Sequence, residues 1–337
     1  MKDLRVKKRA GFPAAVRNLL RVLLGAGLLG LLLGTAGWGR LAAAAAPALG
    51  RWPWLLAAAA WTGLGLLLAA QRWGLMLAVA GISLRRGPLW RVYLVGQFFN
   101  AFLLGACGGD VVRAWYAARR APGRTVEAAA TIFLDRGLGL LVMVFFCCGM
   151  ILLRIHMFLD HDGPRDAGFL MLTFLAAGVA GTVLLFQRRL LERFGLFRRM
   201  ERSGRVGDWL RRAYEALYVY RHHPRVVTKA VLLSLGNLVA LTLACHAVGQ
   251  ALGVAVALGD YFVLFPLISV IAAAPLTPGA LGVREGLFVG LFQAVFVPAS
   301  QALVLSLLVY ASGAIWSLVG GVLYTTMPEK RPVDESA

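Results

Sequence analysis

Charged residues are scarce in this sequence. Asp, Glu, Lys and Arg make up only 15% of its 337 residues, whereas an ordinary soluble domain has about 25%. Apolar and aromatic residues make up 59%. This composition excludes a disordered chain, because disorder goes with low hydrophobicity and high charge. It also argues against a soluble globular protein.

Groups with catalytic or metal-binding chemistry are few as well. The four cysteines all lie in apolar runs, with no CxxC or Cys/His spacing typical of a metal site, and we interpret them as small buried hydrophobic residues. They are Cys107, Cys147, Cys148 and Cys245. No GxSxG, HExxH or P-loop sequence occurs. We therefore expect a protein that is not an enzyme, needs no cofactor, and does only passive or gradient-driven work unless a partner supplies energy.

Long uncharged runs are what the sequence has in abundance. They cover over half of the chain, and each is close to or above the roughly 18 to 20 residues with which a helix crosses a hydrocarbon core of about 30 Å. The runs are 22–39, 52–71, 92–109, 137–153, 167–187, 230–259, 261–283 and 286–328. They predict an all-α polytopic membrane protein with about six full spans and two re-entrant helical hairpins, about eight hydrophobic segments in all.

The basic residues orient these segments. The formal net charge is +19, but the Lys and Arg residues lie in short loops between apolar runs, where they face the cytoplasm and anionic lipid rather than nucleic acid. The basic segments are 1–21, 72–91 (in which we count Arg72) and 188–229, whereas 154–166 and 251–260 read as outside. We expect a multi-pass protein of the bacterial inner membrane with both termini in the cytoplasm.

The segments group into a tail, a membrane domain and a second tail. The basic tail covers 1–21, the membrane domain 22–327 and the C-terminal tail 328–337. Run 22–39 exceeds the roughly 7 to 15 apolar residues of a signal peptide, so we expect an uncleaved first span. The two halves of the domain, about 52–153 and 226–325, are joined by the basic linker 188–225. Part of this linker is amphipathic, which is typical of a helix in the inner-leaflet interface or of a solvated linker helix.

Two segments cannot be simple spans. Segment 113–124 is as basic as 72–91, so 92–112 should enter from the cytoplasm, break near Gly105 and return. In the second half, 261–298 should enter and leave from outside and break near Pro275, Pro278 and Gly279. Broken segments at matching places of two inverted halves indicate a transporter's substrate site. The alternative is that Gly and Pro are simply common in membrane helices.

Charges inside the apolar segments are the candidate site, because an ionised group in a bilayer is costly and usually functional. Asp110 and Arg113 follow the first break three residues apart, beside a helix start that suits a phosphate group. Arg284 and Glu285 follow the second break in the same way. The candidate residues for binding a lipid head group are Gly108, Gly109, Asp110, Arg113, Asp135, Arg136, Gly282, Arg284 and Glu285.

Three arginines and three carboxylates in this set suggest ion pairs across the two halves. We expect Asp110 to cap its helix, and pairs such as Arg113 with Asp135 or Arg136 with Glu285. Adjacent helical residues diverge, so Asp135 and Arg136 each need a partner elsewhere. The alternative is that these pairs only fasten the helices together. Weaker candidates for lining a path are Gln97, Asn100, Asn237 and His246.

Three motifs in order give a resemblance. GGDVVRAWYAARR (108–120), EAAATIFLDRGLGLL (127–141) and PLTPGALGVREGLF (275–288) resemble the flippase-like integral membrane domain of lysylphosphatidylglycerol synthases, which also occurs as stand-alone proteins. The resemblance covers about 20–325 and implies re-entrant helices and movement of lipid between leaflets. Gly105 stands where the family's pattern has a proline. Only about ten residues follow the last span, so we expect no lysyl transfer.

The sequence thus predicts a flippase-like protein that moves a phosphate-containing envelope lipid between leaflets. Its cargo could be a phospholipid, a polyprenyl-linked sugar or another envelope lipid. The expected partners are membrane lipids with anionic or zwitterionic head groups and envelope lipid-modifying enzymes. The alternatives are a non-transporting accessory or scaffold protein of an envelope lipid or glycan pathway, and a transporter of small solutes.

Overall fold

The fold is helical throughout the part of the chain that the structure describes. The computed structural model describes residues 14–102, 108–153, 169, 171–181, 204–274, 277 and 280–326, and within these ranges it contains helices and turns but no strand. The predicted all-α class is confirmed for these residues.

Four helices are long and apolar enough to cross a membrane. They are α3 (Trp52–Val79), α6 (Thr125–Leu153), α12 (Pro224–Leu252) and α15 (Ala299–Thr325). Four of the six expected spans, about 52–71, 126–153, 226–250 and 300–325, agree with these bounds, except that α3 continues for two turns beyond Arg72. Another expected span, 167–187, is described only in part, as an apolar helix over Met171–Gly181.

The expected first span is not one straight helix. The chain forms α1 (Ala14–Ala36) and α2 (Trp38–Gly50), and the stretch from Ala26 onward bends by 87° between them. The bend falls at Gly37, whose φ of 78° costs a glycine little because it has no Cβ. The described helices therefore give four membrane-length apolar helices, or five if the bent pair counts as one span.

Two broken helix pairs occur where the hairpins are expected. The first is α4 (Arg86–Phe102) with α5 (Gly108–Arg120), and the second is α13 (Leu258–Ala272) with α14 (Val283–Gln293); in each pair the two helices pack together. The predicted break residues Gly105, Pro275, Pro278 and Gly279 lie outside the described residues.

The first pair is antiparallel and closely packed. Near the break, the backbone N–H of Gly109 donates to Oδ1 of Asn100 (2.9 Å), and farther away Arg113 lies against Gly96. A Cβ added at Gly109 would lie 1.8 Å from the carbonyl oxygen of Gly96. A glycine is therefore required where the two backbones meet.

The packing of the helices repeats between the two halves. If α3, α4, α5 and α6 are exchanged with α12, α13, α14 and α15, each substantial helix contact of the first half has a counterpart in the second. For example, α4 packs on α15 as α13 packs on α6, and α5 packs on α6 as α14 packs on α15. The two halves thus share one pattern of helix contacts.

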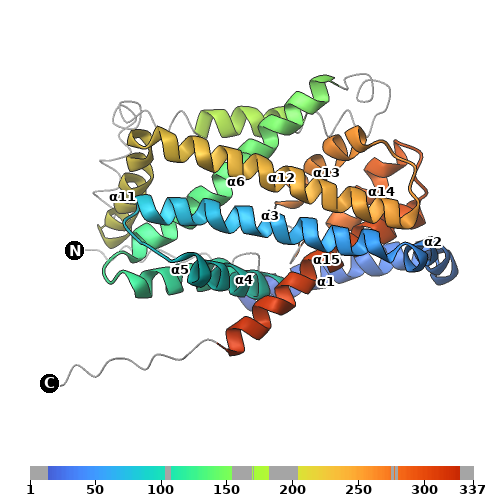
Figure 1. Ribbon diagram of the computed structural model, residues 1–337, viewed down its shortest axis with the longest axis horizontal. Helices are drawn as coiled ribbons and strands as arrows, with labels where there is room; N and C mark the ends of the chain where they lie inside the picture. The colour runs from blue at the N-terminus through green and yellow to red at the C-terminus, as the bar shows by residue number, and fades with distance from the viewer. Residues whose placement is uncertain are drawn as a thin grey trace, which may run out of the picture.

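The equivalent helices α3 and α12 run side by side in opposite directions, as Figure 1 shows. At one end, Arg51 of the α3 N-cap donates to the carbonyl oxygen of Gln250, near the end of α12 (3.2 Å). At the other end, the phenol of Tyr220, just before α12, donates to the carbonyl oxygen of Met76 (2.7 Å). The α4–α5 and α13–α14 pairs lie toward opposite ends of the bundle. The repeat is therefore inverted.

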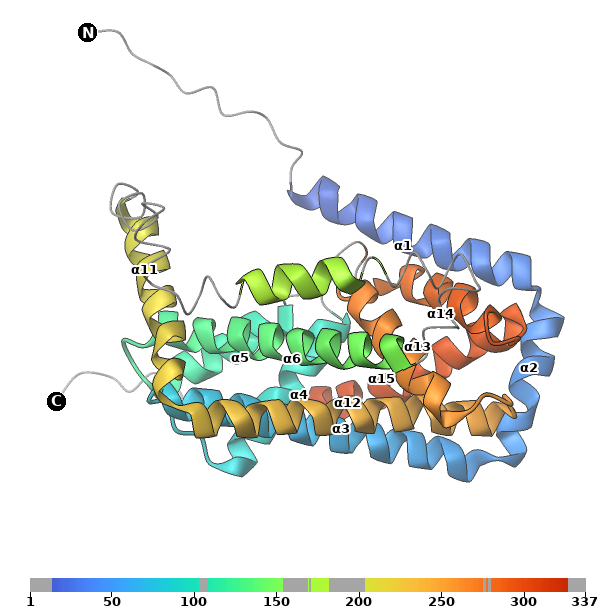
Figure 2. The same cartoon turned by 90° about the horizontal axis from the view of Figure 1, so that it is seen from above.

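The linker between the halves ends in a helix across the bundle. Helix α11 (Gly204–Tyr218) and the short 3₁₀ helix η1 (Val219–His222) lie at the end where α3 finishes and α12 begins (Figure 2). Tyr214 is buried toward the bundle, whereas Arg211 and Arg212 are exposed. Helix α11 thus has a buried side and an exposed basic side. Residues 188–203 lie outside the described residues.

We expect that Gly320→Ala destabilises the fold. A Cβ at Gly320 of α15 would lie 2.0 Å from the carbonyl oxygen of Leu94 in α4, and overpacking of this kind costs about 1–3 kcal/mol. Thermal unfolding in detergent, followed by tryptophan fluorescence, should show a lower midpoint for this variant. Gly313→Ala on the same helix is the control, because a Cβ there meets nothing within 4 Å. Equal midpoints for the two variants would contradict this packing.

Candidate functional site

Asp135 of α6 is the centre of a buried group of charges. It is 2% exposed, and its carboxylate accepts from arginines on two other helices. Arg72 of α3 donates from Nε to Oδ1 (2.7 Å), and Arg113 of α5 donates from Nη2 to Oδ2 (3.2 Å). The predicted pair between Arg113 and Asp135 is therefore present.

The sequence analysis placed Arg72 wrongly and missed its part in this group. We counted this residue among the basic residues of a cytoplasmic loop, but it is buried in α3, where its Nη1 also donates to Oγ of Ser234 on α12 (2.8 Å). We missed its burial because the sequence analysis ended each span at a charged residue. The signal that could have found it is the apolar pattern that continues through Trp73, Met76 and Leu77, all of which are buried.

Asp110 is a partner of arginines rather than a helix cap. Helix α5 already begins at Gly108, three residues before the first helical residue that a cap at Asp110 would give, and Asn100 of α4 accepts the Gly109 N–H instead. Oδ2 of Asp110 lies 2.6 Å from Nε of Arg136, and Oδ1 lies 3.6 Å from Nη1 of Arg113. Asn100, one of the weaker candidates, thus has a structural role at this helix start.

Arg136 differs from the other arginines of this group in its exposure. Its side chain is 47% exposed, whereas those of Arg72 and Arg113 are buried. The structure pairs Arg136 with Asp110, not with Glu285 as we expected, because α5 places Asp110 next to α6 within the same half. Arg136 is therefore the member of the group that a ligand can reach first.

Two aromatic rings hold the Arg113 guanidinium in place. Its Cζ lies 4.4 Å from the ring centre of Trp73 and 4.5 Å from that of Tyr93, distances at which a cation is attracted to an aromatic face. Trp73 is itself fixed, because its indole N–H donates to Oγ1 of Thr131 (3.2 Å). The charge of Arg113 is thus satisfied by two carboxylates and two rings.

The second group of charges lies at the start of α14. Glu285 is completely buried; one of its carboxylate oxygens accepts the backbone N–H of Gly282 (2.6 Å), and the other pairs with Arg284. Arg284 also donates from Nε to Oγ of Ser306 on α15 (3.4 Å) and lies over the ring of Tyr310 (4.5 Å). Glu285 therefore serves as a cap for its own helix, a role that the sequence analysis did not assign to it.

The two groups differ in their charge balance. In the first group, Arg72, Arg113 and Arg136 outnumber Asp110 and Asp135 by one positive charge, whereas Arg284 and Glu285 of the second group balance. Our prediction that the charges form a neutral set of three arginines and three carboxylates is wrong, because the buried Arg72 adds a fourth arginine. A site with an excess cation favours an anionic ligand such as a phosphate group.

The described residues show no metal site. Among them, no group of three or more His, Cys, Asp or Glu side chains lies close enough to hold an ion. The described cysteines Cys147, Cys148 and Cys245 are buried thiols, in agreement with their interpretation as small hydrophobic residues.

Comparison with known proteins identifies the family. A family model described as "Lysylphosphatidylglycerol synthase TM region" matches residues 18–320, which is most of the chain, so the protein belongs to this family. Comparisons with curated proteins and with solved structures gave no match. Family and helices together indicate a multi-pass membrane protein connected with lipid metabolism or translocation.

We expect that Asp135→Asn strongly destabilises the protein. The change leaves Arg72 and Arg113 buried without their shared carboxylate, and the loss of one partner from a buried ion pair costs about 3–5 kcal/mol. Glu215→Gln is the control, because the Arg211–Glu215 pair is about half exposed and such pairs contribute little. The measurement is the midpoint of thermal unfolding in detergent. A midpoint for Asp135→Asn equal to that of the control would show that the buried pairs do not hold α3, α5 and α6 together.

Proposed function

We propose that this member of the lysylphosphatidylglycerol synthase TM region family moves a phosphate-containing envelope lipid between the leaflets of the bacterial inner membrane, without catalysing a reaction. The observation that carries this proposal is the group of three arginines and two aspartates contributed by α3, α5 and α6. Its excess positive charge, held among apolar helices, matches the phosphate of a lipid head group.

The proposed arrangement in the membrane follows the inverted repeat. Helices α3, α6, α12 and α15 cross the bilayer, together with a first span from the bent α1–α2 pair and a sixth that contains 171–181. The α4–α5 hairpin enters from the cytoplasmic side and α13–α14 from the outside. The opposite directions of α3 and α12 support this arrangement, as does the position of the two hairpins toward opposite ends of the bundle.

The geometry suggests how a head group would be admitted. Arg136 is half exposed and its partner Asp110 lies on the hairpin helix α5. An incoming phosphate can take over the Arg136 contact from Asp110, while Arg72 and Arg113 stay fixed on Asp135. When no lipid is bound, the carboxylate of Asp110 pairs with Arg136, so that this guanidinium is not left without a counter-charge within the bilayer.

The proposed partners are membrane lipids with anionic or zwitterionic head groups and envelope enzymes that modify them. Because the sequence contains no P-loop, we infer that transport runs down a gradient of lipid or of ions. A scaffold protein for such enzymes would keep the same helices but would not speed the exchange of lipid between leaflets.

Leaflet exchange of a fluorescent phosphatidylglycerol in reconstituted vesicles tests the function. We expect Arg136→Gln to reduce the exchange rate by about 10²-fold, because the variant loses a charged hydrogen bond to the phosphate that is worth about 1.5–3 kcal/mol. Arg119→Gln on α5 is the matched control: Arg119 is exposed and lies over the ring of Trp115. The same experiment with Arg113→Gln and Arg284→Gln, at equal expression, tests both hairpins.

If vesicles with the wild-type protein exchange lipid no faster than empty vesicles, the translocase proposal is wrong and a scaffold protein is favoured. If the wild type is active and Arg136→Gln retains the rate of Arg119→Gln, the site is wrong.

The proposed orientation has its own test. Both termini should lie in the cytoplasm, because the basic residues of 1–21 and 188–229 favour that side. We therefore expect a C-terminal fusion to green fluorescent protein to fluoresce in bacterial cells and a C-terminal fusion to alkaline phosphatase to be inactive. The opposite pair of results would reverse the whole topology.

A further inference from the structure

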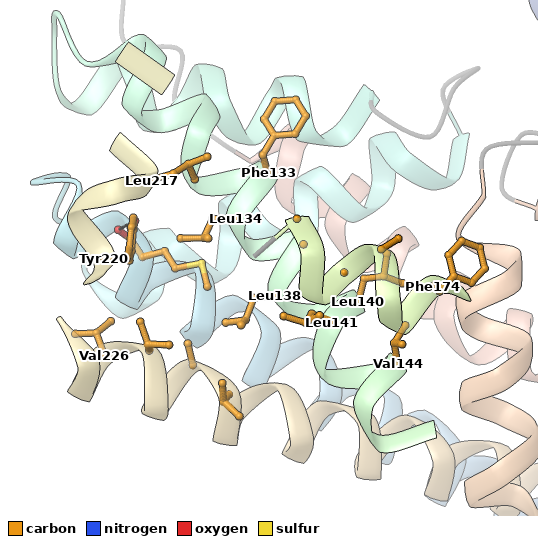
Figure 3. Close-up of a pocket in the computed structure, with 18 residues that line it drawn as sticks. Phe133, Leu134, Leu138, Leu140, Leu141, Val144, Phe174, Leu217, Tyr220 and Val226 are labelled. Atoms are coloured by element: carbon orange, nitrogen blue, oxygen red, sulfur yellow. Dashed lines mark hydrogen bonds between the residues drawn. The ribbon is translucent and has the colours of Figure 1, made fainter. Parts of the chain in front are cut away.

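An apolar groove of about 700 Å³ runs along α6 on the outer side of the charged group. It lies between α6, α12 and the helix Met171–Gly181, and its end is closed by α11 and η1 (Figure 3). Leu217 and Tyr220 lie at that end, whereas Val144 and Phe174 lie at the other. Nearly all of its 18 lining residues are aliphatic, aromatic or glycine, and the one phenol, of Tyr220, already donates to Met76. Among the described lining residues, no side chain offers a free hydrogen-bonding group to a polar ligand.

The length of the groove matches one acyl chain. Along α6 it extends from Phe133 to Val144, and at 1.5 Å per residue these eleven steps span roughly 16 Å. A hydrocarbon core of about 30 Å has two leaflets, so a lipid chain in one leaflet extends for about 15 Å. The volume also lies within the range of about 300–1,000 Å³ of ligand sites.

The groove and the charged group are neighbours on three helices. On α3, Met76 lines the groove one turn after Arg72; on α6, Leu138 lines it three residues after Asp135; and on α12, Ala230 lines it one turn before Ser234. Residues three or four apart lie next to one another on a helix. The charged group therefore backs the wall of the groove.

Arg136 lies at the edge of the groove. It follows Phe133 by three residues and precedes Leu140 by four, and both of these line the groove, so its position adjoins their stripe on α6. Its side chain is half exposed and points to Asp110 of α5. An amphiphile in the groove thus has a cation beside its apolar chain.

We propose that the groove binds one acyl chain of a membrane phospholipid whose phosphate lies at Arg136. This inference rests on the proposed function and deepens it: it assigns the lipid as a diacyl phospholipid and names the surface that holds its chain during transfer. Helices α6 and α12 and the helix Met171–Gly181 form the walls.

Gly137 permits a direct block of the groove. It lines the groove, and a Cβ added there meets nothing within 4 Å. Gly137→Phe should therefore fold and fill the groove with its ring. Gly149→Phe on the same helix is the matched control, because Gly149 is exposed, lies outside the lining and also has free space around its Cβ.

The test is photolabelling with a phosphatidylglycerol that carries a diazirine in one acyl chain. The full-length protein is reconstituted in vesicles of phosphatidylethanolamine and this lipid, irradiated and mapped by mass spectrometry. We expect label on α6 between Phe133 and Val144 and on the helix Met171–Gly181, in excess of label on the exposed apolar residues Leu318 and Val322 of α15. Gly137→Phe should lower the groove label by about tenfold or more, because even one surplus methylene in an apolar pocket weakens binding about tenfold and a phenyl ring is larger. Gly149→Phe should leave the groove label unchanged.

Groove label that equals the α15 label, or that Gly137→Phe leaves unchanged, would overturn the inference. The leaflet-exchange assay on the same vesicles separates this failure from that of the proposed function. If the label is specific and blocked but no lipid is exchanged, the groove site stands and translocation is wrong. If lipid is exchanged without specific label, translocation stands and the groove is not its path.

Discussion

The carboxylate of Asp135 is the contact on which the site depends. It accepts from Arg72 on α3 and Arg113 on α5, so one side chain of α6 joins a long helix and a hairpin helix. Arg72 extends the connection to Ser234 on α12. Since ionised groups among apolar helices are stable only when paired, this arrangement fixes the relative positions of four helices and leaves Arg136 as the half-exposed charge.

The two halves have the same pattern of helix contacts, but their charged groups differ. The two halves share their helix contacts, yet the charges after the two breaks are used differently. Glu285 caps its own helix and balances Arg284, with the hydroxyl of Ser306 in support. In the first half the carboxylates are shared among three arginines, which leaves an excess positive charge. This asymmetry favours the first hairpin as the place where a phosphate binds, with the apolar groove beside it for a chain.

Several parts of this arrangement could be predicted from the sequence. Long apolar runs gave the places of four membrane-length helices, because backbone groups in a bilayer must be bonded within a helix. The glycines before Asp110 and Arg284 marked two helix starts. The pairing of Arg113 with Asp135 followed from the need to neutralise buried charge. The predicted binding of a lipid head group by these residues stays a prediction.

The sequence by itself determined the helical class, the two broken segments and the candidate charges, because hydropathy and the cost of charge in an apolar medium act on local sequence. Only the tertiary structure decided which charges meet. The apolar pattern after Arg72 indicates a longer helix but not the partners of its guanidinium, which were decided by the packing of α6 and α12 against α3. Arg136 pairs with Asp110 instead of the expected Glu285 for the same reason. The partner of a side chain, like the groove along α6, depends on how helices distant in sequence pack together, and no local pattern records this.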